Sequence, residues 1–191
     1  MRKLTAHILF CTMLMALVSC QSNMAEKKSA DSPFAPRLLL TQSGADFIDE
    51  HKDNVIIEKS LLKLKVDFEN ASSKPLIFPQ PTDAGGGFSH ETHKANYQNA
   101  LTAATLYLLE NDTLALVMAK DILLSYAALY PNLPNHPESK TQSPGRLFWQ
   151  ILNEEVALVY LIQAFDAINS SLSENERATI VTGLFEPMVH F

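Results

Sequence analysis

Residues 143–160 constrain the fold of this chain more than any other stretch. They predict a loop, Ser143-Pro-Gly-Arg146, that leads into a helix ending near Asn169. Because a helix that is apolar all round is buried, we expect this one to lie inside a hydrophobic core. Its apolar residues occupy almost every side: Leu147, Phe148, Trp149, Ile151, Leu152, Val156, Leu158, Val159, Leu161, Ile162 and Phe165.

Three polar residues, Gln150, Asn153 and Glu154, interrupt this apolar stretch near its start. Residues three and four positions apart share one face of a helix, so the three side chains are expected to form one patch. Burying polar groups is costly unless they are hydrogen-bonded. The patch therefore either forms a closed structural network or lines a cavity that holds a polar ligand.

The balance of charges excludes one class of partner. The 191 residues include 15 Lys and Arg against 21 Asp and Glu, a net charge of −6. Nucleic-acid binding needs clustered Lys and Arg that contact phosphates, so we expect no nucleic-acid partner. An acidic polysaccharide stays compatible with this charge, because its site can be locally basic in an acidic protein.

The first 20 residues resemble a bacterial lipoprotein signal peptide. Arg2 and Lys3 precede an apolar segment over residues 8–18, which is too short for a confident membrane span. The segment ends in Leu17-Val18-Ser19-Cys20, the pattern of a lipoprotein cleavage box. We expect cleavage before Cys20 and acylation of its thiol; the alternative is an ordinary signal peptide with a chance cysteine.

The residue after Cys20 is Gln21, so no aspartate indicates retention in the inner membrane. We therefore expect a periplasm-facing lipoprotein anchored in the outer membrane only through its lipid. Residues 21–36 are rich in Ser, Ala, Lys and Pro and are expected to form a flexible tether. Residues 37–191 are expected to form the folded domain.

The folded part predicts an all-α protein with no confident strand. Long loops over residues 76–87 and 131–145 alternate with tight turns, which favours antiparallel helical hairpins and hence an incomplete α/α toroid. A ring closes only with more hairpins, so we expect the chain to be the N-terminal part of a longer protein. The expected helices start after Thr41, Asn54, Ser89, Asp112 and Ser173, and the last carries a capping box with Glu176.

The first of the two long loops ends in Gly85-Gly-Gly-Phe-Ser-His90, and His93 follows on the next turn. His90 and His93 lack a third ligand at metal-binding spacing, so no metal and no cofactor are predicted. The glycines have the composition of an anion-binding loop at a helix start, but the pattern matches no phosphate loop. The cluster either lines a site or is simply a loop packed by histidines.

The second long loop carries Lys140 and Arg146 beside the polar patch. These cations suit a carboxylated ligand. The alternatives are a solvent-exposed charge for Lys140 and a pair with Glu154 or Glu155 for Arg146. No Ser-His-Asp arrangement, cysteine nucleophile or paired carboxylates can be argued from the sequence.

Four segments together resemble the N-terminal domain of oligoalginate lyases. The resembling family is polysaccharide lyase family 17, in the heparinase II/III-like group, and the resemblance extends from about Leu38 to the last residue. It implies an α/α toroid followed by an antiparallel β-sheet domain. The segments are residues 83–94 (DAGGGFSHETHK), Leu129-Tyr-Pro131, residues 143–154 (SPGRLFWQILNE) and residues 183–188 (GLFEPM).

The resemblance implies exolytic β-elimination on alginate oligomers, which releases unsaturated uronate. An Asn-His pair in the family neutralises the C5 carboxylate, and Tyr and His side chains move the protons. No residue of this chain matches those motifs, so no catalytic residue is assigned and the isolated chain is expected to be inactive. The resemblance makes Gln150 a substrate contact, with Asn153, Lys140 and His90 as weaker candidates.

Besides the alginate lyase interpretation, the sequence leaves two alternative functions and one oligomeric state for testing. The alternatives are a related lyase acting on a glycosaminoglycan and a non-catalytic glycan-binding lipoprotein. A homodimer of the full-length parent is a further expectation. The sequence does not indicate a preference between mannuronate and guluronate.

Overall fold

The computed structural model describes residues 34–139 and 143–191, and the elements in these two ranges are helices joined by loops, with no strand. The predicted all-α class is therefore confirmed. Cys20, the signal segment, residues 21–33 of the tether and Lys140 lie outside the described residues. The elements are α2 Gln42–Glu50, α3 Val55–Ser72, α4 Phe88–Glu110, α5 Thr113–Leu129, η1 Tyr130–Asn132, α6 Ile151–Ile168, η2 Asn169–Ser171, α7 Glu174–Ile180, η3 Val181–Phe185 and α8 Glu186–Val189.

Most of the predicted helix starts are confirmed by the hydrogen bonds at their caps. Thr41, Asn54 and Asp112 each accept a backbone N–H from the first turn of the following helix. Ser173 and Glu176 form the complete capping box at the start of α7. These caps satisfy N–H groups that have no partner inside the helix, so short polar residues at these positions define where each helix begins.

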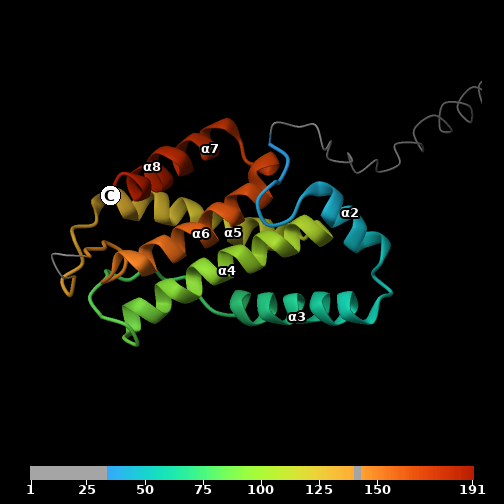
Figure 1. Ribbon diagram of the computed structural model, residues 1–191, viewed down its shortest axis with the longest axis horizontal. Helices are drawn as coiled ribbons and strands as arrows, with labels where there is room; N and C mark the ends of the chain where they lie inside the picture. The colour runs from blue at the N-terminus through green and yellow to red at the C-terminus, as the bar shows by residue number, and fades with distance from the viewer. Residues whose placement is uncertain (1–33, 140–142) are drawn as a thin grey trace, which may run out of the picture.

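Helix α4 is the centre of the fold and packs mainly against α5 and α6 (Figure 1). Helices α4 and α5 form an antiparallel hairpin, because Asn111 ends α4 in the left-handed conformation (φ 54°) and Asp112 caps α5. The next helix, α6, packs beside α4, while α7 and η3 pack against α5. Successive helices thus alternate between two layers, and closure of such hairpins into a toroid stays a prediction.

Helix α5 with η1, over residues 113–132, is long and apolar enough to cross a membrane by length and composition. Its apolar side chains are instead explained by the core, because Ala119, Ile122, Leu123 and Tyr126 are completely buried. A buried core helix passes the same test of length and composition as a membrane span.

The prediction that the helix after residue 146 is buried on every side was wrong. The helix begins at Ile151, and one face of it is exposed: Leu152 is 63% exposed and Val159 is 50% exposed. The buried face carries Ala157, Leu161 and Ala164, whose small and apolar side chains allow close packing on α4. Apolar composition on all sides indicated burial, but among the described residues only one face of α6 has helices packed on it.

The last predicted helix is interrupted before Pro187. The chain leaves the α-helical pattern at Val181 and forms a π-helical turn through Phe185, after which α8 starts with Pro187 in its first turn. Proline removes one backbone donor, and a π turn next to it accommodates the lost hydrogen bond. Gly183 lies in this turn because a Cβ there would come within 2.6 Å of the Ala127 carbonyl oxygen on α5.

Candidate functional site

The two long loops meet at the end of the molecule where α4 and α6 begin (Figure 1). The ring of His90 lies edge-on to Phe148, with centroids 5.0 Å apart. A Cβ on Gly85 would lie 3.7 Å from Trp149 Nε1 and 4.0 Å from His90 Cε1. Segments separated by more than 50 residues in the sequence therefore form one surface, which we call the loop face, around Gly85, His90, Trp149 and Gln150.

Glu154 holds the second loop on the first turn of α6. Its side chain is 2% exposed, and its two carboxylate oxygens accept the backbone N–H groups of Leu147 at 3.2 Å and Phe148 at 2.9 Å. Burial raises the pKa of Glu154, while these hydrogen bonds act in the opposite direction. For Glu154 the structure thus supports the first sequence alternative, a structural network.

Gly145 allows the chain to fold back tightly before α6. A Cβ at this position would overlap the carbonyl oxygen of Phe148 and lie 3.0 Å from the Phe148 carbonyl carbon. The Gly145 carbonyl accepts the backbone N–H of His136 at 2.7 Å, which ties the two halves of this loop together. The Pro-Gly-Arg segment is therefore a close backbone approach that only glycine permits.

The predicted N-cap Ser89 was wrong, because α4 begins two residues earlier, at Phe88, and its N-cap is Gly87. The Ser89 hydroxyl instead accepts the backbone N–H groups of Thr82 and Asp83, both at 3.0 Å. In return the Asp83 carboxylate accepts the Ser89 N–H at 2.7 Å. These hydrogen bonds from Ser89 lower the pKa of Asp83.

This exchange explains the glycine-rich loop without an external anion. Gly86 has φ +87°, a conformation that favours glycine, and a Cβ on Gly87 would overlap the Asp83 side chain. The negative charge at the start of α4 is supplied by Asp83 itself, which suits the positive end of the helix dipole.

His93 is completely buried and structural. Its Nε2 donates to the Pro79 carbonyl at 2.9 Å, since a carbonyl only accepts, and the Tyr126 hydroxyl then donates to Nδ1 at 3.0 Å. Burial lowers the pKa of His93 to about 4, so the ring is neutral near pH 7. His93 thus anchors the first loop to α5.

His90 is 9% exposed, and its Nδ1 is buried with no hydrogen-bond partner among the described residues. This ring nitrogen is therefore enclosed by the protein, and the ring edge at Cε1 lies near Gly85. Within the described ranges, no group of three or more His, Cys, Asp and Glu is arranged to hold a metal ion.

Gln150 and Asn153 are half-buried, and the hydrogen bonds found in the described ranges involve neither side chain. Gln150 is the N-cap of α6 but makes no capping bond. The predicted patch is therefore divided: Glu154 points back to the loop, while the two amides stay available. Substrate contacts by Gln150, Asn153 and His90 stay predictions, and Lys140 lies outside the described residues.

Arg146 does not form the predicted alternative pair with Glu154 or Glu155. Its guanidinium lies over the ring of Phe191, 4.6 Å from the centroid, and 5.9 Å from the centroid of Tyr130. A cation on aromatic faces is stabilised by the ring quadrupole, so Arg146 packs the base of the loop.

His136 is a residue of the loop face to which the sequence assigned no role. It is 3% exposed, its Nδ1 accepts the backbone N–H of Glu138 at 3.1 Å, and its ring also lies near the Asp83 backbone. Burial lowers the pKa of His136. A histidine among four prolines and polar residues carries no signal of burial; only the folding of this loop against residue 83 shows it.

The low pKa of the buried His93 predicts how the free energy of unfolding depends on pH. The unfolded histidine binds a proton near pH 6.5, whereas the folded one does so only near pH 4. Stability is therefore lost as pH falls through this window, and the free energy of unfolding should decrease by about 2 kcal/mol between pH 7 and pH 5 from this group. Urea unfolding at a series of pH values measures the slope.

The matched variants are His93→Gln, which removes the buried titrating group, and His51→Gln, which removes an exposed histidine. The slope should flatten by about one proton in His93→Gln and stay unchanged in His51→Gln. Equal slopes in wild type and His93→Gln would show that His93 does not control acid stability.

A groove elsewhere in the molecule includes none of Gln150, Asn153 and His90. It lies between α3 and α4, has a volume of about 950 Å³ and is lined at one end by Tyr160 of α6. Gln150, Asn153 and His90 thus lie at the starts of α4 and α6, whereas this groove runs between α3 and α4.

Two known proteins are similar to this chain in sequence. No family model matches the chain. It is 48% identical over 127 residues to an exo-oligoalginate lyase of Saccharophagus degradans, covering 66% of this chain and 17% of that protein. It is 38% identical over 181 residues to an alginate lyase of Stenotrophomonas maltophilia, covering 95% and 24%. This similarity supports an alginate lyase family for the chain, which spans about a fifth of the length of these relatives.

Proposed function

We propose that the chain is part of an alginate-degrading lyase of polysaccharide lyase family 17, acting exolytically on alginate oligomers. The observation that carries this proposal is the 38% identity to an alginate lyase over 181 residues, which includes both loops of the loop face. The similarity to an enzyme named exo-oligoalginate lyase supports the exolytic mode.

The described residues are suited to holding a sugar acid. The Gln150 and Asn153 amides each offer donors and an acceptor to hydroxyl or carboxylate oxygens, and His90 lies beneath the same face with its Nδ1 buried. Glu154 and Gly145 keep the loop that carries Trp149 and Gln150 in one conformation. Lys140, in the same loop, supplies a cation to a carboxylate.

The reaction itself requires three steps that these residues do not perform. The C5 carboxylate is neutralised, a base removes the C5 proton, and the C4–O4 bond breaks as O4 is protonated, which leaves a C4=C5 double bond. We assign no residue of this chain to those steps. The loop face binds and orients the sugar, so its substitutions are expected to act mainly through substrate binding.

The test is elimination by the full-length protein on alginate oligomers, followed by ultraviolet absorbance of the new double bond beside the carboxylate. We expect Gln150→Ala to lower kcat/KM by about tenfold, because one hydrogen bond to a charged or polar sugar group is lost. Gln163→Ala, a half-buried glutamine further along α6, is the matched control and should retain activity.

Substrate choice decides between the enzyme classes. Absorbance that rises with a glycosaminoglycan but not with alginate would assign the related lyase class instead. No absorbance change with any uronate polymer would remove the lyase proposal and favour a glycan-binding lipoprotein.

We also propose that the protein is a periplasm-facing lipoprotein anchored in the outer membrane through acylated Cys20, supported by the sequence pattern before that residue. Detergent-dependent release of wild type, but not of Cys20→Ser, from the membrane fraction tests the anchor. A homodimer of the full-length protein is part of the same proposal, and its molar mass in solution tests it.

A further inference from the structure

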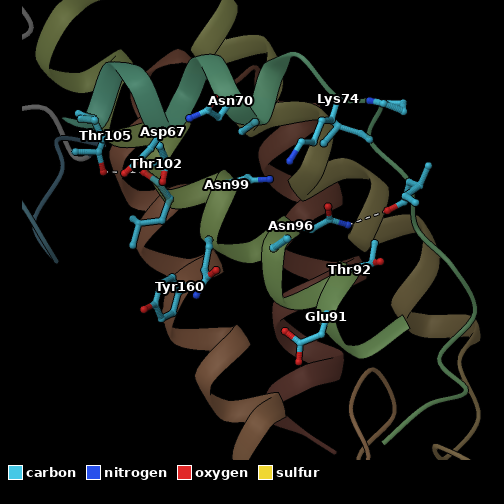
Figure 2. A pocket seen from close by; sticks show the side chains of 18 of the residues that line it. Asp67, Asn70, Lys74, Glu91, Thr92, Asn96, Asn99, Thr102, Thr105 and Tyr160 are labelled. Atoms are coloured by element: carbon cyan, nitrogen blue, oxygen red, sulfur yellow. Dashed lines mark hydrogen bonds between the residues drawn. The ribbon is translucent and has the colours of Figure 1, made fainter. Parts of the chain in front are cut away.

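The groove between α3 and α4 has the chemistry of a second ligand site (Figure 2). Figure 2 shows amide, hydroxyl and charged side chains from both helices directed toward it, with Tyr160 at one side. The segment after α3 completes the wall with Lys74, Pro75, Leu76 and Ile77. A concave volume of about 950 Å³ is large enough for a ligand of several rings.

Several polar groups in the groove have no partner in the described part of the chain. The side chains of Asn70 on α3 and Asn99 on α4 form no hydrogen bond there, although each offers two donors and an acceptor. Asn96 is different, because its amide nitrogen donates to the Ile77 carbonyl at 2.9 Å and thereby fixes the wall. Two amides without a described partner therefore line the groove, one from α3 and one from α4.

The charges in the groove leave one cation uncompensated in the described ranges. Asp67 is paired with Lys63, and Glu91 is paired with Lys94 at 3.5 Å. Lys74 lines the groove and forms no ion pair with any described residue. The groove thus carries one ammonium group without an ion-pair partner in the described ranges, together with two carboxylates that are each paired with a lysine outside the groove.

The groove is also lined by apolar side chains and an aromatic ring. Leu64 and Leu101 belong to this lining, and the Tyr160 ring is held against Tyr97, with centroids 4.9 Å apart. A sugar ring presents apolar C–H faces and polar hydroxyl edges. A lining that combines apolar side chains with amides matches such a ligand, and the ammonium group matches a carboxylate on it.

We propose that the α3–α4 groove binds an acidic oligosaccharide, with Lys74 contacting a uronate carboxylate and Asn70 and Asn99 contacting hydroxyl groups. The choice of a uronate ligand rests on the proposed function, since the lyase substrate is the acidic saccharide available to the protein. The groove would hold part of a longer alginate chain while the loop face holds another part.

The experiment is native electrophoresis of the full-length protein in the cold, in gels with and without alginate. The mobility ratio between the two gels gives an apparent dissociation constant for each variant. We compare Gln150→Ala alone, Gln150→Ala with Lys74→Ala and Asn99→Ala, and Gln150→Ala with Lys59→Ala. Lys59 is an exposed lysine of α3 outside the groove, so its substitution removes the same charge.

In the Gln150→Ala background, the two groove substitutions should raise the apparent dissociation constant about tenfold, because a charge-assisted and a neutral hydrogen bond are lost. The Lys59→Ala substitution should leave it unchanged. The proposal is overturned if alginate retards the groove and Lys59 variants equally. It is also overturned if a neutral galactomannan retards the Gln150→Ala protein as strongly as alginate does.

Two further measurements keep the result interpretable. Thermal unfolding by circular dichroism shows that the groove variants are folded, as expected for substitutions of residues that are not buried. Initial rates of the groove and Lys59 variants on an alginate disaccharide should match those of Gln150→Ala alone, because a disaccharide is too short to span both surfaces. If the wild-type protein shows no lyase activity, the proposed function is wrong. If the groove substitutions leave the retardation by alginate unchanged, only the proposal about the groove is wrong.

Discussion

Gly145→Ala should destabilise the protein by about 3 kcal/mol and disrupt the loop face, because the new methyl group meets backbone rather than side chain. The added Cβ would overlap the Phe148 carbonyl oxygen and lie 3.4 Å from the Gln150 carbonyl carbon. A backbone carbonyl cannot rotate away without moving the whole turn. The loop would have to open, and Trp149 and Gln150 would move with it.

Urea unfolding measures the stability change, and Trp149 fluorescence reports the loop, since Trp149 is the only tryptophan of this chain. Gly85→Ala is the matched control, because its Cβ would meet only ordinary contacts at 3.7 and 4.0 Å. A Gly145→Ala protein as stable as Gly85→Ala would show that the turn is more adaptable than its geometry indicates.

Glu154→Ala should cost roughly 3 kcal/mol and reduce activity on alginate oligomers, because the N–H groups of Leu147 and Phe148 lose their acceptors inside the protein. Relief of the buried charge offsets part of this loss, since burial raises the pKa of Glu154. Glu154→Gln keeps one acceptor oxygen and turns an amide toward the second N–H, so its stability should fall between wild type and Glu154→Ala.

The adjacent Glu155 gives the control, because it is exposed on the same turn of α6. Glu155→Ala should change the free energy of unfolding by less than about 0.5 kcal/mol. If Glu154→Ala and Glu155→Ala unfold at the same urea concentration, Glu154 does not stabilise the loop and the reduced activity needs another cause.

Local signals in the sequence were sufficient for much of the fold. Thr41, Asn54, Asp112 and Ser173 are caps in the structure as predicted, because a capping side chain contacts only its own first turn. Ser89 is not a cap, because its hydrogen bonds are to a loop that precedes the helix and not to its own first turn. Asp83, six residues earlier, reaches the Ser89 N–H through a loop whose path depends on two glycines.

The candidate site was only partly predictable. The sequence identified Gln150, Asn153 and Glu154 as a polar patch, but it left open whether they bind each other or a ligand. The structure shows that Glu154 binds the loop backbone, while the side chains of the other two remain without a described partner. It also shows His136 buried at 3% exposure beside Asp83, which no spacing along the chain indicates.

The sequence by itself determined the helical class, the start of most helices, the glycine-rich and Pro-Gly-Arg loops as special positions, and the similarity to alginate lyases. These depend on contacts within a few residues or on matched motifs. The tertiary structure alone decided which face of α6 is buried, why Gly145 and Gly87 are glycines, and that Lys74, Asn70 and Asn99 line one groove between α3 and α4. Each of these depends on how closely separate segments approach, and hydrophobic patterning along one chain does not encode that distance.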